Sequence, residues 1–252
     1  MSILRYTIPN SLTALSLLLG IASIVTAQLG SLELAAWIIV WCGLLDTVDG
    51  VAARLLKATS EFGAEFDSMA DLVAFGVAPA VLVLNAGLDM AGAEYDTGQF
   101  YVLAAACGVF VLAGAMRLAR FNVATSRPRA GWFIGVPITA AGGGMLASTV
   151  LVMSYHPDVA ASLPLKLYLP ILMFVLALLM ISRLRFPKAT IRKSRFINTF
   201  QAVNIALIFY CAITRSWPEY LFGIAVFLLV AGVIAGRIAK HTDEERTGPA
   251  TV

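Results

Sequence analysis

Residues 46–71 read DTVDGVAARLLKATSEFGAEFDSMAD and place four aspartates, Asp46, Asp49, Asp67 and Asp71, within a short stretch of the chain. The residues on both sides of this stretch are almost entirely apolar. A carboxylate inside the hydrocarbon of a membrane costs about 2.5 kcal/mol or more, and such residues are kept where they serve a function. The stretch therefore predicts a functional site inside a membrane protein.

The composition supports this interpretation. The chain is 60% hydrophobic and 13% charged, whereas soluble domains carry about 25% charged residues. The apolar segments are continuous and approach the roughly 20 residues that a membrane-spanning helix needs, rather than the short alternating strands of a barrel. A soluble protein is excluded, and we predict an all-α polytopic membrane protein.

We expect about eight transmembrane helices with short connections and no separate soluble domain. The predicted spans are 8–28, 33–55, 62–87, 98–122, 133–154, 164–182, 197–214 and 217–237. Residues 1–182 would hold the first six of these spans, and residues 183–240 would add a basic loop and two further spans. Residues 241–252 are polar and are expected to form a disordered tail.

The basic residues predict the orientation. With an even number of spans, only Lys166 and Arg215 of the 18 lysines and arginines fall on the side opposite the termini. Because basic residues concentrate on the cytoplasmic side, we expect both termini to be cytoplasmic, in the cell (inner) membrane. The four aspartates would then lie just below the cytoplasmic surface.

Helical spacing places the aspartates on two facing stripes. Residues three and four apart share one face of a helix. One stripe comprises Asp46, Asp49, Gly50 and Ala53, and the other comprises Gly63, Asp67 and Asp71. Because a short turn joins the two spans, we expect them to be antiparallel neighbours whose stripes form one pocket.

The residue types in this pocket predict a metal and phosphate site. Four carboxylates repel one another unless cations neutralise them, and an all-oxygen cluster suits Mg²⁺, Mn²⁺ or Ca²⁺. Two such ions would balance four charges. The small residues leave room beside the cluster, and Arg54 adds a positive charge suited to phosphate. Metal-assisted phosphoryl transfer is the chemistry that these features favour.

The stretch matches the pattern D-x2-D-G-x2-A-R-x8-G-x3-D-x3-D at every fixed position. This resembles the signature of the CDP-alcohol phosphotransferases, membrane enzymes of phospholipid synthesis. The resemblance implies that Asp46, Asp49 and Asp67 bind divalent metal, Mg²⁺ or Mn²⁺, and that Asp71 binds it too or acts as the general base. It also implies that the CDP group lies along Asp49, Gly50, Ala53, Arg54 and Gly63.

Further segments resemble the serine-using branch of this family. They are ADLVAFGVAPA (70–80), RLARFNV (117–123), GVPITAA (135–141) and LLMISRLRFPK (178–188). This resemblance implies CDP-diacylglycerol and L-serine as substrates, and a homodimer. Arg117 and Arg120, with Asn122 beside them, are candidates to bind the serine carboxylate, since a guanidinium can hold a carboxylate by two hydrogen bonds. Alternatively, the arginines only anchor the helix end or contact anionic headgroups.

Other functions stay open at this point. A related enzyme could use glycerol phosphate or inositol phosphate as acceptor, although a phosphate acceptor would need a denser basic pocket. An ether-linked lipid donor is also compatible with the sequence. A cation transporter would place acids near the membrane midplane on several spans, whereas these four lie on two spans toward one side. Asn10, in IPNSLT (8–13), is a candidate to cap the first span or to contact the site.

Overall fold

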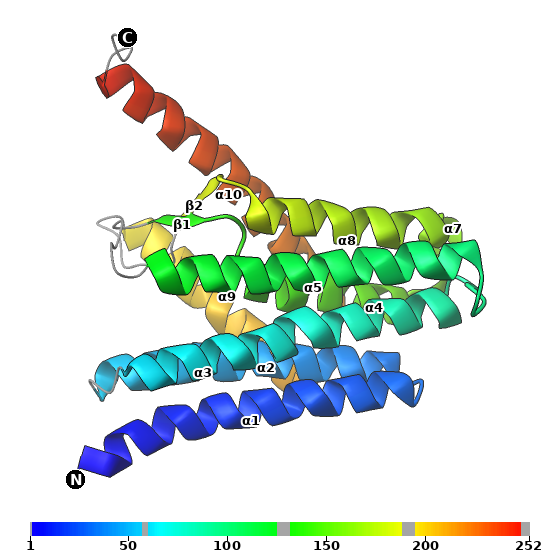
Figure 1. The fold of residues 1–252 in the computed structure, drawn as a ribbon, viewed down its shortest axis with the longest axis horizontal. Helices are drawn as coiled ribbons and strands as arrows, with labels where there is room; N and C mark the ends of the chain where they lie inside the picture. The colour runs from blue at the N-terminus through cyan, green and yellow to red at the C-terminus, as the bar shows by residue number, and fades with distance from the viewer. Residues whose placement is uncertain (1, 57–59, 125–131, 188–194, 248–252) are drawn as a thin grey trace.

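The computed structural model describes residues 2–56, 60–124, 132–187 and 195–247. Most of them form long helices that lie side by side (Figure 1). The helices are α1 (Ser2–Gln28), α2 (Leu32–Leu55), α3 (Glu61–Asp71), α4 (Ala78–Asp89), α5 (Gly98–Ala124), α6 (Ala147–Tyr155), α7 (Pro157–Ser162), α8 (Leu165–Ile181), α9 (Arg195–Thr214) and α10 (Pro218–Thr247). Two π-helical segments, η1 (Leu72–Val77) and η2 (Thr139–Leu146), continue directly into α4 and α6.

Within these described residues, six helical segments are long and apolar enough to cross a membrane. They are Thr7–Gln28, Leu32–Ala53, Glu61–Asp89, Gly98–Val123, Arg195–Thr214 and Pro218–Ile238. The predicted all-α polytopic membrane protein is confirmed. The other two predicted spans correspond to shorter helical segments: α8, with 17 residues, and η2 with α6, which have eight and nine residues. The count of eight spans therefore stays a prediction.

The start of the predicted span 133–154 is wrong. Residues Trp132–Ile134 form strand β1, which pairs in antiparallel register with strand β2 (Arg185–Pro187). Gly135 follows with a positive φ of 76°, which glycine adopts without strain, and its N–H donates to the carbonyl of Leu184. Helical structure begins only at Thr139, because the backbone of residues 132–135 is hydrogen-bonded to the segment around β2 and is therefore not helical.

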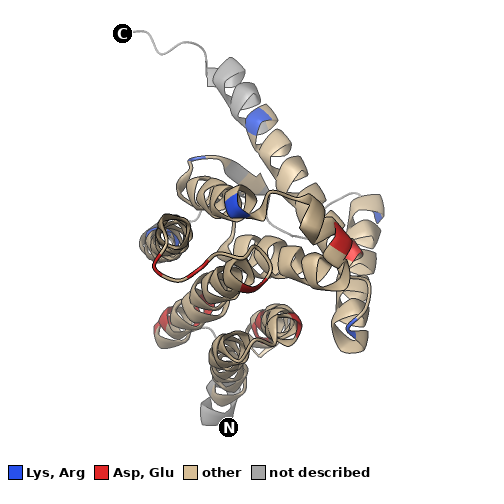
Figure 2. Ribbon diagram, turned by 90° about the vertical axis from the view of Figure 1, so that its right-hand side faces the viewer, with Lys and Arg blue, Asp and Glu red and all other residues tan. Residues whose placement is uncertain are grey.

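The C-terminal helix also extends further than predicted. Residues 241–247, which we expected to be disordered, continue α10, and the remainder of the predicted tail lies outside the described residues. In the view along the bundle, α10 leaves the other helices at an angle (Figure 2). Its apolar part packs against β2 and α6. At Gly232, an added Cβ would lie 2.2 Å from the ring of Phe186, so this glycine allows the close approach.

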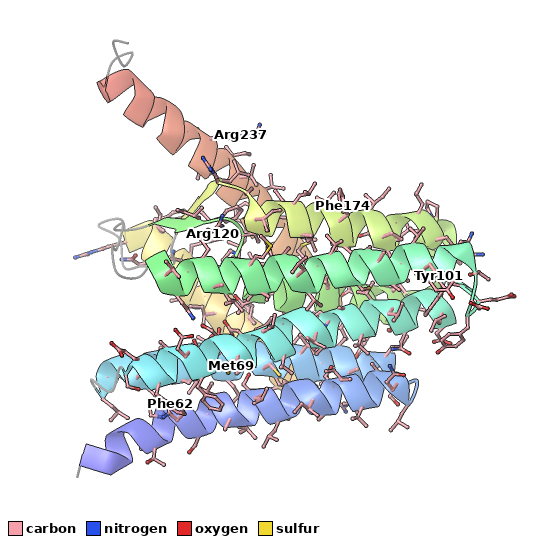
Figure 3. All side chains as sticks on the ribbon, in the orientation of Figure 1. Phe62, Met69, Tyr101, Arg120, Phe174 and Arg237 are labelled. Atoms are coloured by element: carbon pink, nitrogen blue, oxygen red, sulfur yellow. The ribbon has the colours of Figure 1, made fainter. Side chains whose placement is uncertain are left out.

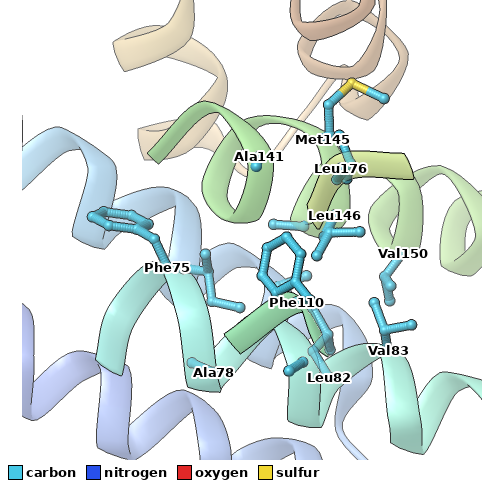
Figure 4. Packing of buried hydrophobic residues seen from close by; sticks show 14 of the residues in the cluster. Phe75, Ala78, Leu82, Val83, Phe110, Ala141, Met145, Leu146, Val150 and Leu176 are labelled. Atoms are coloured by element: carbon cyan, nitrogen blue, oxygen red, sulfur yellow. The ribbon is translucent and has the colours of Figure 1, made fainter. Parts of the chain in front are cut away.

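The centre of the bundle is a close crossing of η1 and η2. Pro79 has no N–H, so the carbonyl of Phe75, four residues earlier, receives no helical hydrogen bond from it. One residue before Pro79, the Ala78 N–H donates to the carbonyl of Val73, five residues back, which is the π-helical pattern. A Cβ at Gly142 would lie 1.9 Å from the Phe75 carbonyl oxygen. Only a glycine permits this contact. Buried apolar side chains from several helices surround the crossing, among them Phe110 and Leu146 (Figure 4).

Candidate active site

Three of the four aspartates gather where the end of α2 faces the start of α3. Asp46 and Asp49 come from α2 and Asp67 from α3, and one carboxylate oxygen of each lies within 4.8 Å of the others. Asp49 is only 6% exposed, and the other two are partly buried. The predicted facing of the two stripes is confirmed for these three residues.

Asp71 occupies a different position. It is the last residue of α3, directly before η1, and it does not belong to the group of three whose oxygens converge. It nevertheless lies within electrostatic range of Asp46, Asp49 and Asp67, and of Arg117 on α5. The structure thus brings all four acids into one region and places the buried Arg117 near Asp71.

Helix α1 forms a third wall of the site; the sequence analysis proposed Asn10 as a contact from this helix but did not single out Thr13. The Thr13 hydroxyl lies 3.0 Å from Oδ2 of Asp49 and 3.2 Å from the carbonyl of Pro9. Thr13 is 5% exposed. Hydroxyl residues are common in membrane-spanning helices, and α1 also contains Ser16 and Thr26, so the sequence alone does not distinguish Thr13 from them.

The small residues of the motif differ in the space beside them. A Cβ at Gly50 would meet nothing within 4 Å, so the backbone of α2 is accessible there. At Gly63 a Cβ would lie 3.0 Å from Ser60 Oγ and 3.2 Å from Asn10 Oδ1. Ser60 caps α3 by accepting the Gly63 N–H. Asn10 lies inside α1, so it does not cap the start of this span as one alternative had it; its side chain lies beside Gly63.

The remaining motif positions lie on α2. Ala53 is partly buried, and Arg54 follows it one residue before the end of the helix. The side chain of Arg54 lies outside the described part of the structure. Lys57 lies in the connection to α3, where residues 57–59 are also not described.

The three predicted acceptor residues near the end of α5 have different surroundings. Arg117 is 7% exposed and lies near Asp71. Arg120, labelled in Figure 3, donates to the carbonyls of Ile134, Met180, Ile181 and Ser182 and so connects α5 to β1 and to the end of α8. Asn122 donates to Glu65 Oε2 at 3.0 Å and exchanges hydrogen bonds with Ser68 on α3.

The donor set of the cluster fits a hard divalent cation. Its three converging groups are all carboxylates, and oxygen-only sites favour Mg²⁺, Mn²⁺ or Ca²⁺ over metals that prefer nitrogen or sulfur. Their mutual repulsion would fall when a cation binds between them. Fold and site together define a polytopic membrane protein with a candidate divalent-metal site.

The comparisons identify the family. Residues 6–235 match the family model described as CDP-alcohol phosphatidyltransferase, and the chain belongs to this family. A Helicobacter pylori protein named CDP-diacylglycerol–serine O-phosphatidyltransferase is 38% identical over 182 residues, covering 72% of each chain. A protein of the same name from Methanocaldococcus jannaschii is 34% identical over 228 residues, covering 90% of this chain and 93% of the relative.

A third relative carries a different name. The archaetidylserine synthase of Methanothermobacter thermautotrophicus is 30% identical over 183 residues, covering 72% of this chain and 70% of the relative. Both names describe serine-containing lipids. The resemblance found in the aspartate signature is thus confirmed at the level of the family.

Proposed function

We propose that this protein transfers the phosphatidyl group of CDP-diacylglycerol to the hydroxyl of L-serine, giving phosphatidylserine and CMP. The observation that carries the proposal is the convergence of Asp46, Asp49 and Asp67 in a chain whose relatives bear the names above. A cation transporter is disfavoured by the same observations, since the acids lie on two neighbouring helices and the family is one of transferases.

The metal would be Mg²⁺ or Mn²⁺, as two ions held by Asp46, Asp49, Asp67 and Asp71. When bound, it would offset the carboxylate charges and polarise the phosphate oxygens of the donor. The open backbone face at Gly50 supports a position for the CDP group beside α2. Asp49, Ala53, Arg54 and Gly63 would complete this nucleotide site.

Asp71 would act as the general base. Its carboxylate takes the proton from the serine hydroxyl, and the hydroxyl oxygen forms a bond to the β-phosphorus, which carries the lipid. The bond from this phosphorus to the bridging oxygen breaks, and CMP leaves with that oxygen. The separation of Asp71 from the three converging acids supports a distinct role for it.

Serine would bind through Arg117, Arg120 and Asn122. The position of Arg117 near Asp71 supports this assignment, because a serine carboxylate at Arg117 would bring the hydroxyl toward the base. A guanidinium has five N–H donors, so Arg120 can hold the end of α8 and still offer a donor.

We further propose the inner membrane as the location, with both termini and the site cytoplasmic, and a homodimer as the assembly. The core would comprise residues 1–182, followed by 183–240 and the cytoplasmic tail 241–252. In support, only 11% of the apolar stretch of Arg195–Thr214 is buried within the protein, whereas 56% of the apolar stretch of Glu61–Asp89 is buried. Such a weakly packed helix has surface for lipid or for a second copy.

One experiment tests the function. Purified protein would receive labelled CDP-diacylglycerol, or its ether-linked analogue, with serine, glycerol phosphate or inositol phosphate, and CMP release would be measured. We expect CMP release with serine and Mg²⁺ or Mn²⁺, and none after chelation with EDTA. Release with glycerol phosphate or inositol phosphate but not with serine would overturn the proposal. The ether-linked arm is included because of the archaetidylserine synthase relative.

A further inference from the structure

Thr13 belongs to α1 and not to the aspartate signature. Its side chain is buried at the contact of α1 with α2, and its hydroxyl lies 3.0 Å from Oδ2 of Asp49. Asp49 is itself buried and belongs to the converging group. The contact therefore joins α1 to a candidate metal ligand without adding charge.

The hydroxyl has one proton and two nearby acceptors. The carbonyl of Pro9 lies at 3.2 Å and the Asp49 oxygen at 3.0 Å. A hydrogen bond to an ionised acceptor is roughly twice as strong as one between neutral groups. The proton is thus best placed on the line to Asp49, where it restrains rotation of the carboxylate.

We propose that Thr13 is a positioning residue that holds the Asp49 carboxylate in the orientation required for divalent-metal binding, an inference that rests on the proposed function. Residues that hydrogen-bond to metal ligands fix ligand orientation, and their loss lowers metal affinity by roughly 10- to 100-fold. The rest of α1 gives Thr13 a rigid base, since Gly20 of the same helix packs against the backbone of Ala74 in η1.

The chain provides a matched control on the same helix. Thr26 also donates its hydroxyl to the carbonyl four residues earlier, Ala22, but it lies near the far end of α1, more than three helical turns from Thr13. Thr13→Val and Thr26→Val remove the same group from α1 while keeping the side-chain shape. Thr13→Ser keeps the donor, and Thr13→Ala removes it with a smaller side chain.

The experiment measures Mn²⁺ binding to the purified full-length protein by electron paramagnetic resonance, without substrate. We expect Thr13→Val and Thr13→Ala to weaken Mn²⁺ binding by about tenfold or more, and Thr13→Ser and Thr26→Val to bind like the wild type. In the CMP-release assay, the metal concentration for half-maximal rate should rise by the same factor, with kcat at saturating metal little changed. Melting in EDTA checks that each variant is folded.

The outcomes separate the two proposals. If the wild type binds Mn²⁺ and Thr13→Val and Thr13→Ala bind it equally well, the role of Thr13 is refuted and the proposed function stands. Equal weakening in Thr13→Ser, or in Thr26→Val, would likewise refute it, because the donor to Asp49 would not be the cause. A wild type that binds no Mn²⁺ would overturn both the metal site and this inference.

Discussion

The aspartate cluster and the η1–η2 crossing share one continuous helical segment, since α3 carries Asp67 and leads directly into η1, yet they are built in opposite ways. The cluster joins three acids from α2 and α3, with open space beside Gly50. The crossing brings two backbones into contact at Gly142 and excludes everything larger than a hydrogen atom there. The comparison teaches that a site made of mutually repelling groups lies next to a point where two helix backbones are in direct contact.

This contrast makes different predictions for the two regions. Substitutions in the cluster should remove activity without loss of stability, since like charges at a site lower the stability of the metal-free protein. Substitutions at the crossing should lower stability first, since overpacking a dense interior forces the backbone to move.

The largest effect is expected for Asp46→Asn. Removing this ligand should reduce CMP release by about 10³-fold or more, since metal stabilisation of transition-state charge is worth several kcal/mol. Mn²⁺ binding should be lost, whereas the melting temperature in EDTA should stay equal or rise. Asp89→Asn, an exposed residue at the end of α4, is the control and should change neither. Normal turnover by Asp46→Asn would refute the site.

Asp71→Asn should lower kcat by about 10²–10⁴-fold, the usual contribution of a general base. Because Asp71 lies apart from the three converging acids, the variant should keep much of its affinity for CDP-diacylglycerol. Protection against thermal unfolding by the donor lipid would measure this affinity. Joint loss of turnover and donor binding would show that Asp71 acts chiefly as a metal ligand and not as the base.

Gly142→Ala tests the crossing. The added Cβ would clash with the Phe75 carbonyl, and we expect a destabilisation of about 1–3 kcal/mol, seen as a lower melting temperature. Gly108→Ala on α5 is the matched control, because a Cβ there meets nothing within 4 Å. If both variants melt at the same temperature, the close contact is not a determinant of stability.

Arg120→Ala should have the smallest effect on activity. We expect the KM for serine to rise by about tenfold or less, with the KM for CDP-diacylglycerol unchanged. The carbonyls of Ile134, Met180 and Ile181 would also lose a donor. Because these hydrogen bonds are exposed or only partly buried, we expect a smaller loss of stability than the roughly 1–3 kcal/mol of a fully buried unsatisfied group. A change in stability alone would make Arg120 purely structural, and a change in donor KM alone would assign it to the nucleotide site.

Local spacing accounts for what the sequence predicted well. Asp46, Asp49 and Asp67 converge because helical periodicity and a short connection leave two antiparallel helices few other arrangements. The roles of these residues stay predictions.

Contacts between segments distant in sequence could not be predicted. The β1–β2 pair joins residues about 50 apart, and Arg120 reaches carbonyls on two other segments. Neither contact has a periodic signature. Thr13 lies between these cases: its polarity within an apolar span was visible, but its partner 36 residues away was not.

The π-helical segment η1, which follows Asp71, sets the directions in which the two halves of the continuous helix Glu61–Asp89 face. Successive residues of an α-helix advance about 100° around the axis, and a π turn adds roughly one residue to the turn. Along the helix Glu61–Asp89, the side chains after η1 are therefore rotated about the helix axis relative to those before it, between the acidic half and the apolar half. Asp67 can thus face α2 while Leu82 and Val83 face the buried centre. Without this rotation, either the acidic half would face away from α2 or the apolar half would face away from the buried centre.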